Sequence, residues 1–200
     1  MKGAINVANA CKKLGIYFVQ LSSGCIYSGD NNGKGFSEGD TPNFNGSFYS
    51  KTKAEAEKAI DEIGALQLRI RIPIDHFPHP KNLIDKLLGY DQIVVAENSF
   101  TVIEDFLEAT QALINKRATG IFNMTNPGHT NHEFIMKQYK KLVDPSADFS
   151  YINAAQLDEI TKAPRSNCVL NTDKREKLGV KMPEITKRIP SLMREYKANL

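Results

Sequence analysis

Short apolar segments that alternate with helical patterns constrain the fold of this chain more than any other feature. Residues 16–21 form a nearly continuous apolar run, which is typical of a buried strand in a parallel sheet. Further strands are expected at residues 66–72, 93–95 and 120–124. Helices are expected over residues 3–13, 48–63, 81–88, 102–116, 131–142, 153–162 and 171–178, and from about residue 190, where Pro190 would occupy the first turn. This alternation predicts an α/β layered fold with a parallel sheet.

Composition narrows the classes of protein to which the chain can belong. Its 200 residues, 41% of them hydrophobic, suffice for one globular domain. The net charge of +3 comes from scattered basic residues, which favours solvated helix faces over a nucleic-acid surface and suits an anionic small ligand. Cys11, Cys25 and Cys168 have neither paired nor metal-type spacing and indicate reduced thiols. Because no segment resembles a membrane span or a signal peptide, we expect a cytoplasmic protein without membrane partners.

Polar residues that could take part in catalysis or ligand binding lie near the first predicted strand. Ser23 follows this strand, and in open α/β sheets ligands bind beyond the carboxyl ends of strands. A long irregular loop is expected at residues 28–45, before a helix that carries Tyr49 and Lys53 four positions apart. This spacing places both side chains on one helix face, where an ammonium group favours the phenolate form of a neighbouring tyrosine. The same spacing also occurs on many solvated helices without any catalytic role.

Six ordered sequence blocks carry a resemblance to a known family. They are residues 23–27, 35–43, 46–53, 68–74, 125–128 and 163–167. Together they resemble the extended short-chain dehydrogenase/reductases, and within them the bifunctional nucleotide-rhamnose synthase/epimerase-reductases, which are related to dTDP-4-dehydrorhamnose reductase. The resemblance runs from about residue 4 to the C-terminus. It implies a partial Rossmann-like parallel sheet with a mainly helical C-terminal substrate-binding lobe.

The resemblance implies an NADPH-dependent reduction, with NADH as the other nicotinamide donor. Hydride would reach the C4 ketone of UDP-4-keto-6-deoxyglucose while Tyr49 donates a proton to the developing alkoxide. Ser23 would hydrogen-bond the same oxygen, and Lys53 would bind the nicotinamide ribose. Tyr49 and Pro73 are also expected to contact the cofactor. General acid catalysis of this kind contributes roughly 10²- to 10⁴-fold.

The resemblance also implies an epimerisation at C3 and C5 of the sugar, so that the product is UDP-L-rhamnose. Protons at these carbons are acidic because the C4 ketone stabilises the enolate. In this family the acid–base pair is a cysteine two positions after the Ser/Thr and a lysine in the helix after the Pro-rich connection, here Cys25 and Lys86. Taken without the resemblance, Cys25 is more often a small buried hydrophobe and Lys86 an ordinary surface lysine.

Substrate contacts are expected at Ser23, Asn126 and Arg165. The resemblance implies that Arg165 binds the diphosphate of the sugar nucleotide, and the alternative is a surface ion pair. The bidentate binding of phosphate oxygens by a guanidinium favours the first role. His132 belongs to a substrate-lobe block and receives no role. The four histidines form two short pairs, at 76 and 79 and at 129 and 132, that lie in loops without cysteine partners, so we expect no metal.

The family begins with a strand, a Gly-rich turn and a helix that hold the cofactor pyrophosphate, and this sequence opens on a later helix. We therefore expect a C-terminal part of such an enzyme, with residues 1–75 holding the remaining Rossmann elements and residues 76–200 holding mostly the substrate lobe with interleaved sheet elements. The expected assembly is a homodimer, or a complex with a separate chain that supplies the cofactor half. Two other functions stay open: a reductase without epimerase activity, and a non-catalytic regulatory subunit with this fold.

Overall fold

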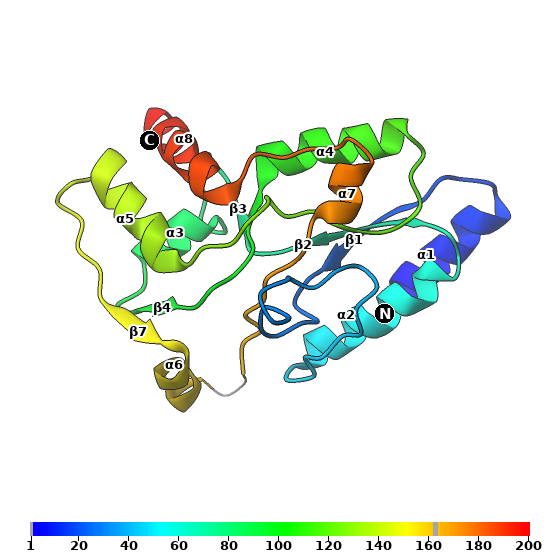
Figure 1. Ribbon diagram of the computed structural model, residues 1–200, viewed down its shortest axis with the longest axis horizontal. Helices are drawn as coiled ribbons and strands as arrows, with labels where there is room; N and C mark the ends of the chain where they lie inside the picture. The colour runs from blue at the N-terminus through cyan, green and yellow to red at the C-terminus, as the bar shows by residue number, and fades with distance from the viewer. Residues whose placement is uncertain (1, 162–163) are drawn as a thin grey trace.

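The structure is a computed structural model that describes residues 2–161 and 164–200. A parallel sheet of three strands in the order β1-β2-β6 lies at its centre (Figure 1). The strands are β1 (Val19–Ser23), β2 (Leu66–Ile70) and β6 (Gly120–Asn123). Their register places Leu68 beside Leu21 on one side and beside Phe122 on the other. The expected α/β fold with a parallel sheet is confirmed.

Helices cover both faces of this sheet. α4 (Ile103–Asn115) packs its buried Ala109 and Leu113 against Leu68 and Phe122, with the short α7 (Asp173–Lys177) on the same side in Figure 1. On the opposite side, α1 (Lys2–Lys13) and α2 (Phe48–Asp61) lie together, and Ala8 and Ile60 share a small apolar cluster. The helices α1, α2 and α4 each turn apolar residues inward, as a layered fold requires.

A second group of elements surrounds its own core. It contains two short parallel pairs, β3 (Pro73–Ile74) with β5 (Thr101–Val102) and β4 (Ile93–Val95) with β7 (Tyr151–Asn153). The helices of this group are α3 (Leu83–Leu88), α5 (His132–Leu142), α6 (Ala154–Ile160) and α8 (Ile185–Ala198). The rings of Tyr139 and Tyr196 meet edge to face between α5 and α8, with centroids 6.3 Å apart. Within the described residues, no helix combines the length and the apolar character that a bilayer crossing requires.

The first two predicted strands differ from the observed ones at their ends. β1 begins at Val19 rather than residue 16, because the backbone N–H of Ile16 still donates to Cys11 at the end of α1. β2 ends at Ile70, and Ile72 adopts a φ of 36°, a left-handed conformation that is strained for a β-branched residue. This break redirects the chain from the central sheet into β3. The run predicted as one strand over 66–72 is therefore a strand, a bend and the approach to another sheet.

The last helix starts earlier than its sequence pattern suggests. α8 begins at Ile185, where the carboxylate of Glu184 caps it by accepting hydrogen bonds from the backbone N–H groups of Thr186 and Lys187. Pro190 lies inside α8, so the prediction that it occupies the first turn is wrong. A proline there removes one i to i−4 hydrogen bond, which the helix tolerates because six of its residues are buried against the core.

The expected irregular loop at residues 28–45 is present and is held by a segment from the far end of the chain. Gly29 forms a parallel bridge with Cys168, and Phe36 forms one with Leu170. The Ser166 hydroxyl donates to the Tyr27 carbonyl at 2.7 Å across a sequence separation of 139 residues. We call residues 166–171 the strap, because they tie this loop to the rest of the molecule.

A buried ion pair joins α2 to the central sheet. The Nη2 atom of Arg69 on β2 lies 2.6 Å from Oε1 of Glu57 on α2, and both side chains are at most 5% exposed. The hydroxyl of Ser22 on β1 donates to Oε2 of Glu57 at 2.9 Å. Arg69 also donates to the carbonyls of Ser37 and Glu38 in the irregular loop. The helix that carries Tyr49 and Lys53 is thus fixed against two strands and the loop.

Candidate active site

A cavity of about 870 Å³ lies where the two groups of elements meet. Four of the residues singled out in the sequence line it: Cys25, Tyr49, Lys86 and Arg165. They come from the turn after β1, from α2, from α3 and from the segment before the strap. Residues separated by up to 140 positions are therefore gathered around one space, as a binding site requires.

Tyr49 and Lys53 lie side by side on α2, as their spacing predicts. Ser47 caps this helix by accepting a hydrogen bond from the backbone N–H of Ser50 at 3.0 Å. The Nζ atom of Lys53 lies 5.6 Å from the ring centroid of Tyr49. Tyr49 is 51% exposed and lines the cavity, whereas Lys53 lines a separate, smaller pocket of about 90 Å³ together with Ser22 and Glu57.

The turn after β1 holds Ser23 and Cys25 at the carboxyl end of the sheet. Ser23 is buried, and its Oγ atom accepts a hydrogen bond from the backbone N–H of Cys25 at 3.2 Å. Between them, Gly24 has no room for a side chain, because an added Cβ would lie 2.7 Å from the Leu170 side chain. The strap therefore packs closely against this turn, and Cys25 lines the cavity.

Arg71 is a charged residue of the cavity wall to which the sequence analysis gave no role. Its Nη1 atom donates to Sγ of Cys25 at 2.7 Å, and its Nε and Nη2 atoms donate to Oδ1 of Asn98 at 3.2 and 2.7 Å. Nη2 also donates to the carbonyl of Ser166 in the strap. A signal was present: arginines at 69 and 71 interrupt an apolar strand, which is unusual unless both are paired in the interior.

The cavity wall is positively charged. Arg71, Lys86 and Arg165 line it, and the part of its lining that the structure describes contains no aspartate or glutamate. Tyr90, Gln92 and Ser166 add hydroxyl and amide groups, and Phe44, Ile72 and Leu83 add apolar surface. Cations without neighbouring carboxylates favour an anionic ligand, and the mixed lining suits a ligand that also carries a ring and hydroxyl groups.

His132 also lines the cavity, at the first turn of α5. Its Nδ1 atom lies 3.1 Å from the Val94 carbonyl, and its ring meets Phe100 edge to face. Burial, together with the positive charge of Arg71, lowers the pKa of this imidazole despite the opposing hydrogen bond to Val94. The neutral ring then donates from Nδ1 and keeps a lone pair on Nε2.

Four of the expected site residues lie outside the cavity lining, namely Ser23, Lys53, Asn126 and Pro73. Asn126 is fully buried, and its amide contacts the backbone N–H of Val102, the carboxylate of Asp105 and the Pro183 carbonyl. This network occupies the side chain and holds β5, α4 and the start of α8 together, so the expected substrate contact of Asn126 is not supported. Pro73 is exposed and opens β3, a position where a strand tolerates proline; its contact with a cofactor stays a prediction.

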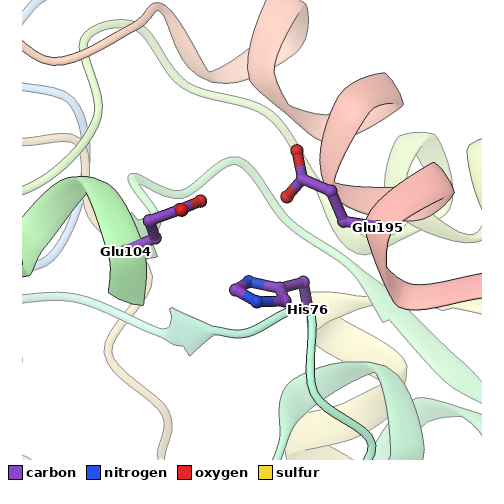
Figure 2. Close-up of side chains that lie close together, drawn as sticks. All are labelled: His76, Glu104 and Glu195. Atoms are coloured by element: carbon purple, nitrogen blue, oxygen red, sulfur yellow. The ribbon is translucent and has the colours of Figure 1, made fainter. Parts of the chain in front are cut away.

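A second polar cluster lies away from the cavity. His76, Glu104 and Glu195 converge from the loop after β3, from α4 and from α8, and their ligand atoms lie within 4.8 Å of one another (Figure 2). Arg188 contacts both carboxylates, with nitrogen to oxygen distances of 2.7 Å to Glu104 and 2.9 Å to Glu195. Because the guanidinium already compensates their charge, we interpret this cluster as an ionic network that links α4 to α8.

Comparison with known proteins places these features in a family. Residues 1–198 match the RmlD substrate binding domain. A bifunctional dTDP-4-dehydrorhamnose 3,5-epimerase/dTDP-4-dehydrorhamnose reductase of Arabidopsis thaliana is 34% identical over 199 residues, which cover 96% of this chain and 65% of the relative. The chain thus spans about two thirds of the length of that relative.

Solved structures give the same result for the fold. The L780 UDP-rhamnose synthase of Acanthamoeba polyphaga mimivirus superposes with a TM-score of 0.92 at 34% identity, over 96% of this chain and 69% of the other. A dTDP-4-dehydrorhamnose reductase of Bacillus anthracis, solved in complex with NADP, superposes with a TM-score of 0.76 at 19% identity, over 96% of this chain and 69% of the other. The second likeness concerns the fold alone.

Proposed function

The chain belongs to the family of RmlD substrate binding domains, and from this premise we propose that it forms the catalytic and substrate-binding part of an NADPH-dependent enzyme. This enzyme converts UDP-4-keto-6-deoxyglucose to UDP-L-rhamnose by 3,5-epimerisation and 4-keto reduction. One observation carries the proposal: Cys25, Tyr49 and Lys86 line a single cavity whose described lining has three cations and no carboxylate. A nucleotide sugar offers the diphosphate that such a wall attracts and the ketone that these side chains can act on.

Epimerisation is assigned to Cys25 and Lys86. The thiolate of Cys25 takes a proton from the carbon next to the ketone, and the electron pair moves into an enolate. The ammonium of Lys86, on α3, returns a proton to that carbon from the other face of the sugar. Cys25 then releases its proton to water and Lys86 takes one from water, which restores both groups. The same exchange at C3 and C5 inverts both centres and consumes no electrons, so it needs no redox partner.

Reduction is assigned to Tyr49, with Ser23 and Lys53 in support. Tyr49 is half exposed at the cavity and gives its phenolic proton to the C4 oxygen, to which the Ser23 hydroxyl donates a hydrogen bond. Tyr49 and Lys53 present a hydroxyl and an ammonium on one helix face, which fits the ribose hydroxyls of a nicotinamide nucleotide. NADPH, when bound, supplies the hydride.

Arg165 is assigned to the diphosphate. Its side chain is exposed at the cavity rim, and the ion pairs found among the described residues do not involve it. A guanidinium at this position offers two parallel N–H donors to phosphate oxygens.

Hydrogen exchange at the sugar carbons tests the proposal without a reductant. The chain is incubated with UDP-4-keto-6-deoxyglucose in D₂O, and the H3 and H5 signals are followed by proton NMR. We expect both signals to disappear, and we expect the rate to fall at least about 100-fold in Cys25→Ser and in Lys86→Met, because each removes one proton-transfer group. Tyr49→Phe keeps the exchange, since Tyr49 acts on the C4 oxygen during reduction.

Cys11→Ser is the matched control, because Cys11 lies on α1 outside the cavity lining. Exchange that persists in Cys25→Ser would contradict the role of Cys25. Absence of exchange in the unaltered chain, with binding of the nucleotide sugar intact, would favour a reductase that acts on an already epimerised sugar.

A further inference from the structure

Arg71 is a buried cation without a carboxylate partner in the part of the chain that the structure describes. Arg71 is only 4% exposed. Among residues 2–161 and 164–200, Arg69 forms an ion pair with Glu57, and Arg188 forms ion pairs with three acidic side chains. None of the ion pairs in these residues includes Arg71. Removing a guanidinium from water is costly unless its charge is compensated.

The other partners of Arg71 satisfy its N–H groups but supply no charge. Two are oxygens of neutral groups, the Asn98 carboxamide and the Ser166 carbonyl. Asn98 is itself rigid, because its Nδ2 atom donates to the Ala96 carbonyl and to Oδ1 of Asn167 at 3.1 Å. Arg71 is therefore held in one orientation, with Nη1 directed at Sγ of Cys25 at 2.7 Å.

Sγ of Cys25 is the one acceptor of Arg71 that can become an anion. The other nearby thiol behaves differently: Cys168 donates from Sγ to the Gly24 carbonyl at 3.2 Å, and burial raises its pKa even though Arg71 opposes the shift. Cys168 is thus kept as the thiol, while Cys25 receives an N–H from a cation and faces the cavity.

We propose that Arg71 is a positioning residue for Cys25: it holds Sγ at the cavity wall and provides the counter-charge of the thiolate. The use of that thiolate as a base rests on the function proposed above. Arg71 itself acts through Cys25, and Asn98 links Arg71 to Asn167 and Cys168 of the strap.

Alkylation of the cysteines tests this pairing without substrate or cofactor. The folded chain is treated with iodoacetamide at pH 7.5, and the modification of each cysteine-containing peptide is followed by mass spectrometry. We expect the rate constant of Cys25 to fall about tenfold or more in Arg71→Gln, since an adjacent opposite charge changes the population of an ionised group by at least this factor. Arg71→Lys keeps the charge, and we expect it to retain the rate within about threefold.

Cys11 is the internal control, because it lies on α1, away from Arg71, and should react equally in all variants. Far-ultraviolet circular dichroism confirms that each variant is folded. If Arg71→Gln does not fold, the unaltered chain still gives a test at pH 6.5, where an unassisted thiol is mostly protonated. Cys25 should then react at least about tenfold faster than Cys11; equal rates would overturn the proposal.

The outcomes separate this inference from the proposed function. If Arg71→Gln is folded and alkylates at the unaltered rate, Arg71 does not support the thiolate, even when exchange at the sugar carbons depends on Cys25. If alkylation depends on Arg71 while the unaltered chain shows no exchange, the Arg71–Cys25 pairing stands and the epimerase assignment fails.

Discussion

His132 brings a titratable group to the cavity wall that the chemistry assigned to Cys25, Tyr49 and Lys86 does not use. Its Nε2 atom is buried and has no hydrogen-bond partner within the described residues. The positive charge of Arg71 acts on this imidazole and disfavours a second positive charge. His132 is therefore a neutral acceptor, and protonating it would place two cations beside each other.

Acidification should destabilise the chain through His132. Burial lowers the pKa of this imidazole in the folded state, whereas the unfolded chain binds the proton near its ordinary value of about 6.5. The unfolded state thus holds more protons below about pH 6.5, and the free energy of unfolding falls as the pH decreases through this range. Urea denaturation at pH 7.5 and 5.5 should show a smaller loss in His132→Asn than in the unaltered chain; an identical loss would contradict this role.

The sequence could predict the residues that touch the cavity better than the residues that hold them. Cys25, Tyr49 and Arg165 were recognisable because they occur in short ordered blocks, and Lys86 because it lies in the helix after the Pro-rich connection. The role of Arg71 depends on Asn98 and on the strap, which only the tertiary fold brings near. The same blocks suggested a substrate contact for Asn126, which the structure uses instead to join β5 to α8.

At the level of elements, α2 shows how a buried ion pair sets the position of a functional helix. Glu57 lies on the face of α2 that is turned toward β1 and β2, and Tyr49 lies two turns earlier at the cavity. The carboxylate of Glu57 accepts from Arg69 and from the Ser22 hydroxyl. Rotation or sliding of α2 would separate these groups, so the pair also fixes the height of Tyr49 above the sheet.

Glu57→Gln should lower the free energy of unfolding by about 3–5 kcal/mol, because it leaves the Arg69 guanidinium buried without its counter-charge. The measurement is urea denaturation followed by circular dichroism at neutral pH. Glu55→Gln, an exposed position on the same helix, is the matched control and should change stability by less than about 0.5 kcal/mol. Equal effects of the two substitutions would show that the ion pair does not anchor α2.

The helices and strands differ in how well their bounds could be predicted from the sequence. Long amphipathic helices such as α4 were predicted within a residue or two, because their apolar period is repeated over several turns. β3, β5 and β7 have only two or three residues each, which is too few for a periodic pattern of apolar residues. They form strands because neighbouring chain segments pair with them. The start of α8 was missed because its cap is a glutamate and its interior contains Pro190.

At the scale of the whole molecule, β1 is an edge of the central sheet among the described strands. Leu21 on this strand is 47% exposed, and Ile16 just before it is 54% exposed. An exposed edge with apolar side chains is a template for pairing with another strand. The surface around β1 is therefore a site at which the chain can associate through strand pairing.

Leu21→Lys should reduce the self-association of the chain, because a lysine on an edge strand opposes strand pairing. The measurement is the weight-average mass by light scattering over a range of protein concentrations. Leu107→Lys is the matched control: Leu107 on α4 is 59% exposed, but it belongs to a helix and offers no strand edge. A fall in mass for both variants, or for neither, would show that association does not run through β1.

The strap has a consequence for the order in which the molecule is built. Its contacts join residues that leave the ribosome far apart in time: Cys168 and Gly24 are 144 positions apart, and Ser166 and Tyr27 are 139 positions apart. Contacts of such long range form late, because the intervening chain must first be closed into a loop. The turn that holds Cys25 and the orientation of Arg71 depend on this closure, because Gly24 packs against Leu170 and Arg71 donates to the Ser166 carbonyl. A nascent chain can thus assemble its central sheet early, whereas the arrangement of Cys25 and Arg71 at the cavity forms only after the strap has packed against the loop.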